Sequence, residues 1–375
     1  MNNRLYFLDT LRTFTIGLVI FYHVTILYTK QFQFLDQFVK NPTPETFDLL
    51  FLVLIFFISG AMLNSIMFFI AGYFAFASYE KKGERLFIAD KLKRLGIPYL
   101  LGLVILSPIT LFIARLSRDK NVKLGHFWIK EFFLPEIITP NHLWFIGILL
   151  IFFIIFIPLF ARLKTKKSRQ IRNSQTLIYV LFLLLTFVVY FCLSCFYKPY
   201  NFLSIYIVDF PVVMLLIYAG YFLLGVYASR RQWFNNENKE PVFPWVIVYV
   251  VNIAIYFGTL IIAGIDPMLN ANHPLLAFSV NGMMFSGVFL LIAVFKKYQN
   301  KPSNLKSWLS KNSYGAYIFH YIIVFAVVYW MLDVPLPFIL KYFIQIFLCP
   351  FLSWGLTDLL KKIQNLLNNF KQQCL

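Results

Sequence analysis

Apolar residues form long runs along this chain, and short polar connections separate the runs. A run of about 20 mainly apolar residues can cross the hydrocarbon of a bilayer as one helix, in which every backbone N–H and C=O is paired internally. The pattern predicts an all-α integral membrane protein, a bundle of about ten transmembrane helices. The spans are expected near residues 5–28, 49–78, 95–114, 143–161, 176–196, 202–228, 243–264, 274–295, 313–332 and 335–360.

Composition and charge agree with a membrane protein. Hydrophobic residues make up 60% of the chain and charged residues only 13%, about half the share in a soluble domain. The formal net charge of +18 would suggest nucleic acid in a soluble chain, but here Lys and Arg lie between apolar runs. They favour one set of alternate connections by about three to one, which predicts that both termini are cytoplasmic. The predicted partner is therefore the lipid bilayer, and no nucleic acid is expected.

The chain shows no internal repeat, no Ser- or Pro-rich linker and no soluble segment of useful size. Residues 1–375 are therefore interpreted as a single membrane domain. Near the C-terminus, residues 355–375 carry Leu, Ile and Phe at helical spacing among Lys and Asn. This pattern predicts an amphipathic cytoplasmic tail along the inner membrane surface.

The first span carries three ionisable side chains, Asp9, Arg12 and His23. Charged groups inside a span are unfavourable, so each of them is a functional hypothesis. Asp9 and Arg12 are three residues apart and can pair along a helix. Arg12 and His23 are eleven apart, which places them on one helix face about 16 Å apart along the axis. One helix is thus predicted to present a cation near the cytoplasmic side and an imidazole toward the outer side.

Four strings along the chain follow one family pattern. The first span has L-D-x-L-R and then the R-x10-H spacing of Arg12 and His23. The others are FFIAGYFAFASYEKKGERLFIADKLKRLGIPYL (68–100), NHLWFIGILLIF (141–152) and SYGAYIFH (313–320). Together they resemble the membrane-bound acyltransferase 3 superfamily, which includes O-acetylases and O-succinylases of bacterial surface sugars.

The resemblance implies an activity and a location. It implies transfer of an acyl group from cytoplasmic acyl-CoA, either acetyl-CoA or succinyl-CoA, to a hydroxyl of an extracytoplasmic or envelope glycan. It also implies a multi-pass protein of the bacterial cytoplasmic (inner) membrane. His23 is then the expected general base, because a neutral imidazole can take a proton from the attacking hydroxyl. Arg12 is expected to hold the donor, or an acyl carboxylate, through its planar fork of N–H donors.

Further residues acquire expected roles from the same resemblance. Lys91 and Arg94 precede the third span at the inner surface, where cations can meet the phosphates of CoA. Family members commonly carry R-x-x-R there, and Lys91 departs from that pattern by offering a point charge in place of a fork. His320, seven residues into the predicted ninth span, is expected nearer the inside, where it lines the donor path or bonds a neighbouring helix.

Substrate contacts are expected at Asp9, His142 and Trp144. His142 starts the fourth span at the outer side, at a depth similar to that of His23, and Trp144 also suits an aromatic belt at the interface. No metal site is predicted, because the histidines are scattered over different spans and no two share a helix at ligand spacing. The groups that stabilise the oxyanion are not identifiable from the sequence.

A second class of function fits part of the pattern. Ten spans with intramembrane Asp, Arg and His would also suit a secondary transporter, or an exporter of glycan or acyl groups, with a proton relay. The hydropathy pattern shows no inverted repeat, and acyl transfer offers a chemical use for Arg12 and His23. The acyltransferase is therefore the favoured interpretation.

Overall fold

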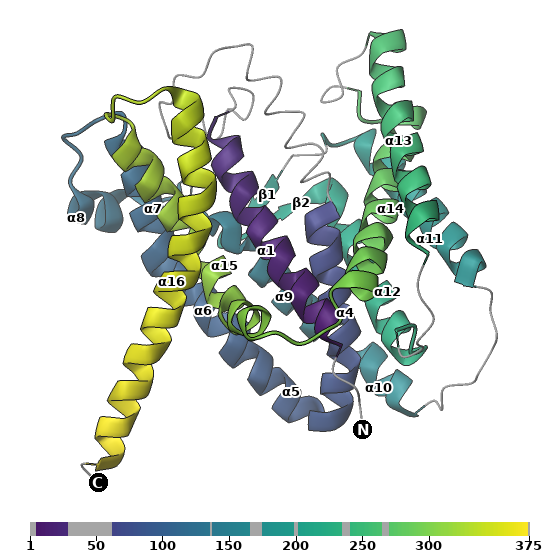
Figure 1. Cartoon of the computed structure of the whole chain (residues 1–375), viewed down its shortest axis with the longest axis horizontal. Helices are drawn as coiled ribbons and strands as arrows, with labels where there is room; N and C mark the ends of the chain where they lie inside the picture. The colour runs from purple at the N-terminus through teal and green to yellow at the C-terminus, as the bar shows by residue number, and fades with distance from the viewer. Residues whose placement is uncertain are drawn as a thin grey trace. The chain divides into compact units, whose positions relative to one another are not determined.

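The computed structural model describes residues 5–28, 62–135, 137–165, 175–198, 202–234, 241–264 and 270–373, and these are mostly helical (Figure 1). Nine helices in these ranges are long and apolar enough to cross a membrane. A pair bent by 43°, Asn141–Ile155 with Ile157–Thr165, makes ten if it is counted as one span. The prediction of an all-α multi-span membrane protein is confirmed.

Eight of the spans are single long helices. They are α1 (Tyr6–Ile26), α4 (Met62–Lys82), α11 (Gln175–Ser194), α12 (Val212–Arg230), α13 (Val242–Ala263), α14 (Pro274–Tyr298), α15 (Asn304–Met331) and α16 (Phe338–Gln373). The bent span consists of η4 (Asn141–Leu143), α9 (Trp144–Ile155) and α10 (Ile157–Thr165).

The third span is a chain of short helical pieces. They are α5 (Glu84–Lys91), η1 (Leu92–Gly96), α6 (Ile97–Leu101), η2 (Gly102–Leu106) and α7 (Ser107–Leu116), of which η1 and η2 are π-helical. Each π-helical piece ends two residues before a proline, Pro98 or Pro108. Proline has no N–H for the α-helical ladder, and a wider π turn lets the backbone continue past that gap.

The sixth span differs from its predicted bounds. Residues 202–211 form an antiparallel hairpin, with β1 (Phe202–Ile205) paired to β2 (Val208–Pro211), and α12 starts only at Val212. Ser204 lies opposite Asp209 in this hairpin, and Tyr206 takes a left-handed φ of 53° in the turn. Pro211 fits a strand end and the position before a helix better than a helix interior. The prediction that the helix begins at residue 202 was wrong.

The chain divides into two compact units. The first contains the described residues of 1–11, 60–99 and 143–300, and the second those of 12–59, 100–142 and 301–375. In the first unit α4 packs on α12 and α13 lies beside α14; in the second, α15 lies beside α16 (Figure 1). The C-terminal half of α16 carries exposed apolar side chains from Leu359 to Phe370, in the segment predicted as an amphipathic tail.

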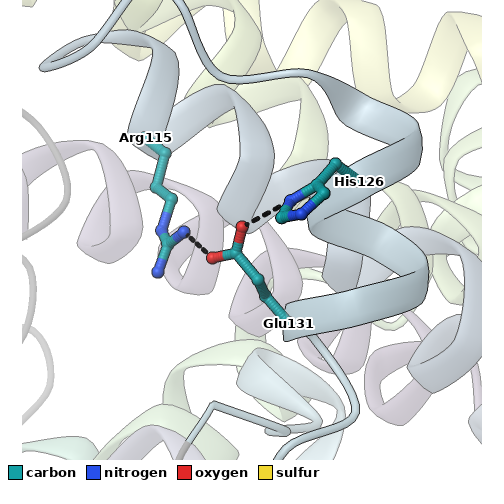
Figure 2. A network of polar contacts seen from close by, with 3 residues as sticks. All are labelled: Arg115, His126 and Glu131. Carbon is teal, nitrogen blue, oxygen red and sulfur yellow. Dashed lines mark hydrogen bonds and ion pairs between the residues drawn. The ribbon is translucent and has the colours of Figure 1, made fainter.

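The segment between α7 and η4 has its own small core. Leu111 packs with Phe127 and Phe132; Phe127 follows α8 (Leu124–His126) as the first residue of η3 (Phe127–Glu131), and Phe132 comes directly after η3. Beside that core, Figure 2 shows the Glu131 carboxylate between Arg115 and His126. One oxygen pairs with Arg115, and the other lies 3.1 Å from His126 Nδ1. The pKa of Glu131 is lowered mainly by the hydrogen bond from Arg115. The positive charge of Arg115 and the contact with His126 lower this pKa further.

This network predicts an acid-sensitive segment. A carboxyl whose pKa is lowered on folding stabilises the fold above its ordinary pKa, and the stabilisation disappears as pH falls through the lowered value. We therefore expect the amides of residues 117–132 to lose hydrogen-exchange protection on acidification below the usual range of a glutamate. Glu131→Gln should lower the protection at neutral pH and make it nearly independent of acid pH. Identical acid profiles for the two proteins would refute this assignment.

Candidate active site

Helix α1 presents Arg12 and His23 to the same neighbour, α15. The Arg12 Nη2 donates to Ser310 Oγ at 3.2 Å, and the His23 ring lies against the rings of His320 and Tyr321. Arg12 to His23 is eleven residues and Ser310 to His320 is ten, so both helices rise by about 15 Å between the two contacts. The two helices therefore run in the same direction, and the predicted common face of Arg12 and His23 faces α15.

Three imidazole rings come together at one end of this face. The ring centroid of His320 lies 5.1 Å from that of His23 and 4.7 Å from that of His142. Tyr321 adds a fourth ring, with its centroid 4.9 Å from both His23 and His142. His142 and His320 are buried, with 6% and 0% of their surface exposed. We call His23, His142 and His320 the histidine cluster.

Hydrogen bonds to backbone carbonyls orient two of these rings. His142 Nε2 lies 3.0 Å from the oxygen of Ile318, and His320 Nδ1 lies 2.5 Å from the oxygen of Tyr317. A carbonyl oxygen only accepts, so each of these nitrogens carries the proton when the ring is neutral. The opposite nitrogens, His142 Nδ1 and His320 Nε2, then hold lone pairs. Both are buried and have no hydrogen-bond partner among the described residues.

The turn before α9 is held against α15. The Tyr317 hydroxyl donates to the backbone oxygen of His142, in addition to the bond from His142 to Ile318. Asn141 begins this turn with a left-handed φ of 50°, an uncommon conformation for a residue other than glycine. Its side-chain amide atoms are buried and have no hydrogen-bond partner within the described part of the chain. Strained backbone and unused polar atoms beside His142 are typical of a functional site.

The C-terminal half of α1 is anchored by α16. The hydroxyls of Thr25 and Tyr342 are 3.0 Å apart, and the Tyr28 hydroxyl donates to Gln345 Oε1 at 3.0 Å. All four of these side chains are buried. Because His23 lies two residues before Thr25, these contacts restrict the rotation of α1 and hold the imidazole toward α15.

His320 is placed differently from the expectation. The predicted ninth span began at residue 313, but α15 begins at Asn304, so His320 is seventeenth in this 28-residue helix and lies past its midpoint. Its ring therefore contacts His23 and His142 at the opposite end of the face from Arg12. Hydropathy marks the apolar part of a helix, whereas the helical backbone continues into the polar segment around Lys306 and Lys311.

Lys91 and Arg94 belong to the first unit, on α5 and η1. The Lys91 ammonium lies 4.0 Å from the ring centroid of Phe153 and 5.1 Å from that of Phe87, in cation–π contact. Arg94 Nε lies 2.8 Å from Asp90, but its side chain is 72% exposed. Asp90 also pairs with Lys82 at 2.7 Å. Arg94 is thus the more accessible of the two predicted cations, and Lys91 is covered by aromatic rings.

Asp9 and Trp144 also belong to the first unit. Asp9 lies in the first turn of α1, where a carboxylate interacts favourably with the positive end of the helix dipole. The Trp144 ring packs edge-on against Phe202, with centroids 5.6 Å apart, and stacks on Tyr218 at 6.1 Å. Both positions have a structural explanation, and their predicted contact with substrate stays a prediction.

Sequence reasoning missed several members of this site. Ser310, Tyr317 and Tyr321 were not singled out, although with His320 they follow helical spacing on α15. That spacing was a usable signal in retrospect, because a stripe of polar and aromatic groups on an apolar helix marks a protein-facing side. Among the described residues, no group of three or more His, Cys, Asp or Glu side chains could hold a metal ion.

Comparison with known proteins agrees with the family resemblance of the sequence motifs. A family model described as an acyltransferase domain, that of acyltransferase 3, matches residues 5–358. Curated relatives include proteins named glucans biosynthesis protein C from Salmonella agona, Salmonella dublin and Salmonella gallinarum, each 25% identical over 233 residues. These matches cover 60% of this chain and 58% of the relatives' length. No solved structure matches the chain.

Proposed function

Because this multi-pass membrane protein belongs to the acyltransferase 3 family, we propose that it moves an acetyl or succinyl group from cytoplasmic acyl-CoA to a hydroxyl of an extracytoplasmic or envelope glycan. The observation that carries the proposal is the histidine cluster, on the same face of α1 as Arg12. The name of the relatives, glucans biosynthesis protein C, supports a glycan acceptor. The proposed location is the bacterial cytoplasmic membrane.

The proposed base is His23. As the glycan hydroxyl attacks the thioester carbonyl, its proton passes to a neutral imidazole nitrogen of His23. The new C–O bond forms, the C–S bond breaks, and the proton then goes to the thiolate of CoA. General base catalysis of this kind contributes typically about 10²–10⁴-fold in rate.

The acceptor is proposed to bind beside His142. The lone pair of His142 Nδ1 is buried and available to a sugar hydroxyl, and the Asn141 amide next to it can both donate and accept. Sugars present many hydroxyls, so recognition requires such unsatisfied polar groups. The turn at residues 141–143 is held to α15, which keeps both groups in a fixed place.

The donor is proposed to meet two sets of cations. Arg12, oriented by Ser310, offers its guanidinium to the thioester carbonyl or to the free carboxylate of a succinyl group. Arg94, exposed at the helical segment before Pro98, is proposed to meet the phosphates of CoA, and Lys91 adds positive charge nearby. A lysine held over aromatic rings contributes to the electrostatic field more than to directed hydrogen bonds.

The test uses the purified full-length protein in proteoliposomes with radiolabelled acetyl-CoA or succinyl-CoA and a glucan acceptor. We expect label to appear on the glucan and free CoA thiol to be released in equal amount. The proposal fails if the protein builds a gradient of glycan or acyl compound while no acyl-CoA is consumed, because that outcome identifies a transporter.

A further inference from the structure

His320 is the most buried member of the histidine cluster, and the proposed chemistry does not use it. None of its surface is exposed, and its ring contacts those of both His23 and His142. An ionisable ring in this position needs a partner for each nitrogen or a function for the unpartnered one.

The tautomer of His320 follows from its backbone contact. Nδ1 faces the carbonyl oxygen of Tyr317 at 2.5 Å and must carry the proton. Nε2 is therefore a hydrogen-bond acceptor, buried and without a partner among the described residues. His320 is in this respect a neutral counterpart of the carboxylate that orients a catalytic imidazole in hydrolytic triads.

His23 offers the complementary nitrogen. Its Nδ1 is also buried and has no hydrogen-bond partner within the described ranges, and its ring centroid lies 5.1 Å from that of His320. A ring rotation that turns His23 Nδ1–H toward His320 Nε2 would pair these two nitrogens, because the rings are already in contact. Catalytic hydrogen bonds are often long without substrate and tighten in the complex.

We propose that His320 is a positioning residue: its Nε2 accepts a hydrogen bond from His23 Nδ1–H and thereby leaves the lone pair on His23 Nε2. That nitrogen then takes the proton of the glycan hydroxyl, while His320 keeps its own proton on Nδ1 and exchanges none. The inference rests on the proposed function, since it presupposes that His23 is the base. It assigns to His320 a role in the proton transfer in place of the expected role on the donor path.

Two amide substitutions test the roles of the two ring nitrogens of His320 one at a time. His320→Asn keeps a donor near the position of Nδ1 but has no atom at the position of Nε2. His320→Gln reaches the position of Nε2 with an oxygen that can accept from His23. We expect His320→Gln to retain most of kcat and His320→Asn to lose at least about tenfold, as does His320→Ala, with the KM for acetyl-CoA unchanged in all three.

Two results would overturn the assignment. If the His320→Asn and His320→Gln proteins are equally stable and show equal kcat, the Nε2 atom has no role. If the KM for acetyl-CoA rises while kcat is unchanged, His320 lines the donor path. Size-exclusion profiles of each variant monitor folding. If the proposed function fails, the parent protein itself transfers no label to the glucan. If only the base assignment fails, His23→Ala retains full activity whatever the His320 variants do.

Discussion

Replacing His23 by alanine should reduce the rate of acyl transfer to glycan by about 10²–10⁴-fold, while the protein still accumulates in the membrane. The reason is that alanine leaves no group at this position of α1 that can take the hydroxyl proton. The anchors of α1 on α16, Thr25 with Tyr342 and Tyr28 with Gln345, are unchanged by the substitution. The measurement is label transferred per mole of protein in proteoliposomes at saturating acyl-CoA.

The matched control is His126→Ala. His126 is also a histidine, but its side chain is 67% exposed and pairs only with Glu131 among the contacts described for it. We expect this variant to transfer acyl groups at the parent rate. Parent activity in His23→Ala would remove the proposed base and leave the histidine cluster without its catalytic interpretation.

Replacing Gly225 by alanine should prevent α4 and α12 from packing. A Cβ atom at Gly225 would overlap the backbone oxygen of Phe69, and one at Gly72 would overlap the backbone oxygen of Phe222. Small residues allow such close approach of membrane helices, and a backbone carbonyl cannot rotate away as a side chain can. Overpacking typically destabilises a protein by about 1–3 kcal/mol, and we expect this site at or above the upper end.

The comparison for this prediction is Gly355→Ala on α16. An added Cβ there meets no atom within 4 Å, so the variant should be as stable as the parent or slightly more stable. The stability of both variants is measured by the melting temperature in detergent and by the monodisperse fraction on size exclusion. A Gly225→Ala protein as stable as Gly355→Ala would show that the two helices are not packed as described.

Several features of the site could be read from residue order alone. Arg12 and His23 share a face because helical geometry repeats every 3.6 residues, whatever the rest of the chain does. His142 at the start of the fourth span was also recognisable, because an ionisable group beside an apolar run is unfavourable unless it has a function. The R-x10-H spacing led to the family that the match over residues 5–358 establishes.

The bounds of the helices and strands were harder to predict from the sequence. Hydropathy marks where a segment is apolar, but α15 starts nine residues before its predicted span because its helix continues through polar residues. Residues 202–211 are mostly apolar and yet form a hairpin, because Pro211 and the left-handed turn at Tyr206 favour strands there. An apolar run of this length does not distinguish a helix from a strand.

Composition and helical periodicity are local properties of the chain. They are enough to predict a bundle of membrane-spanning helices whose first helix carries a cation and an imidazole on one face. The contacts of His320 with both His23 and His142, which are far from it in the sequence, are visible only in the folded chain. The fold also decided that Lys91 is covered by Phe153 and that α4 and α12 meet at two glycines. Such contacts depend on how helices distant in sequence pack together, and no local pattern specifies that packing.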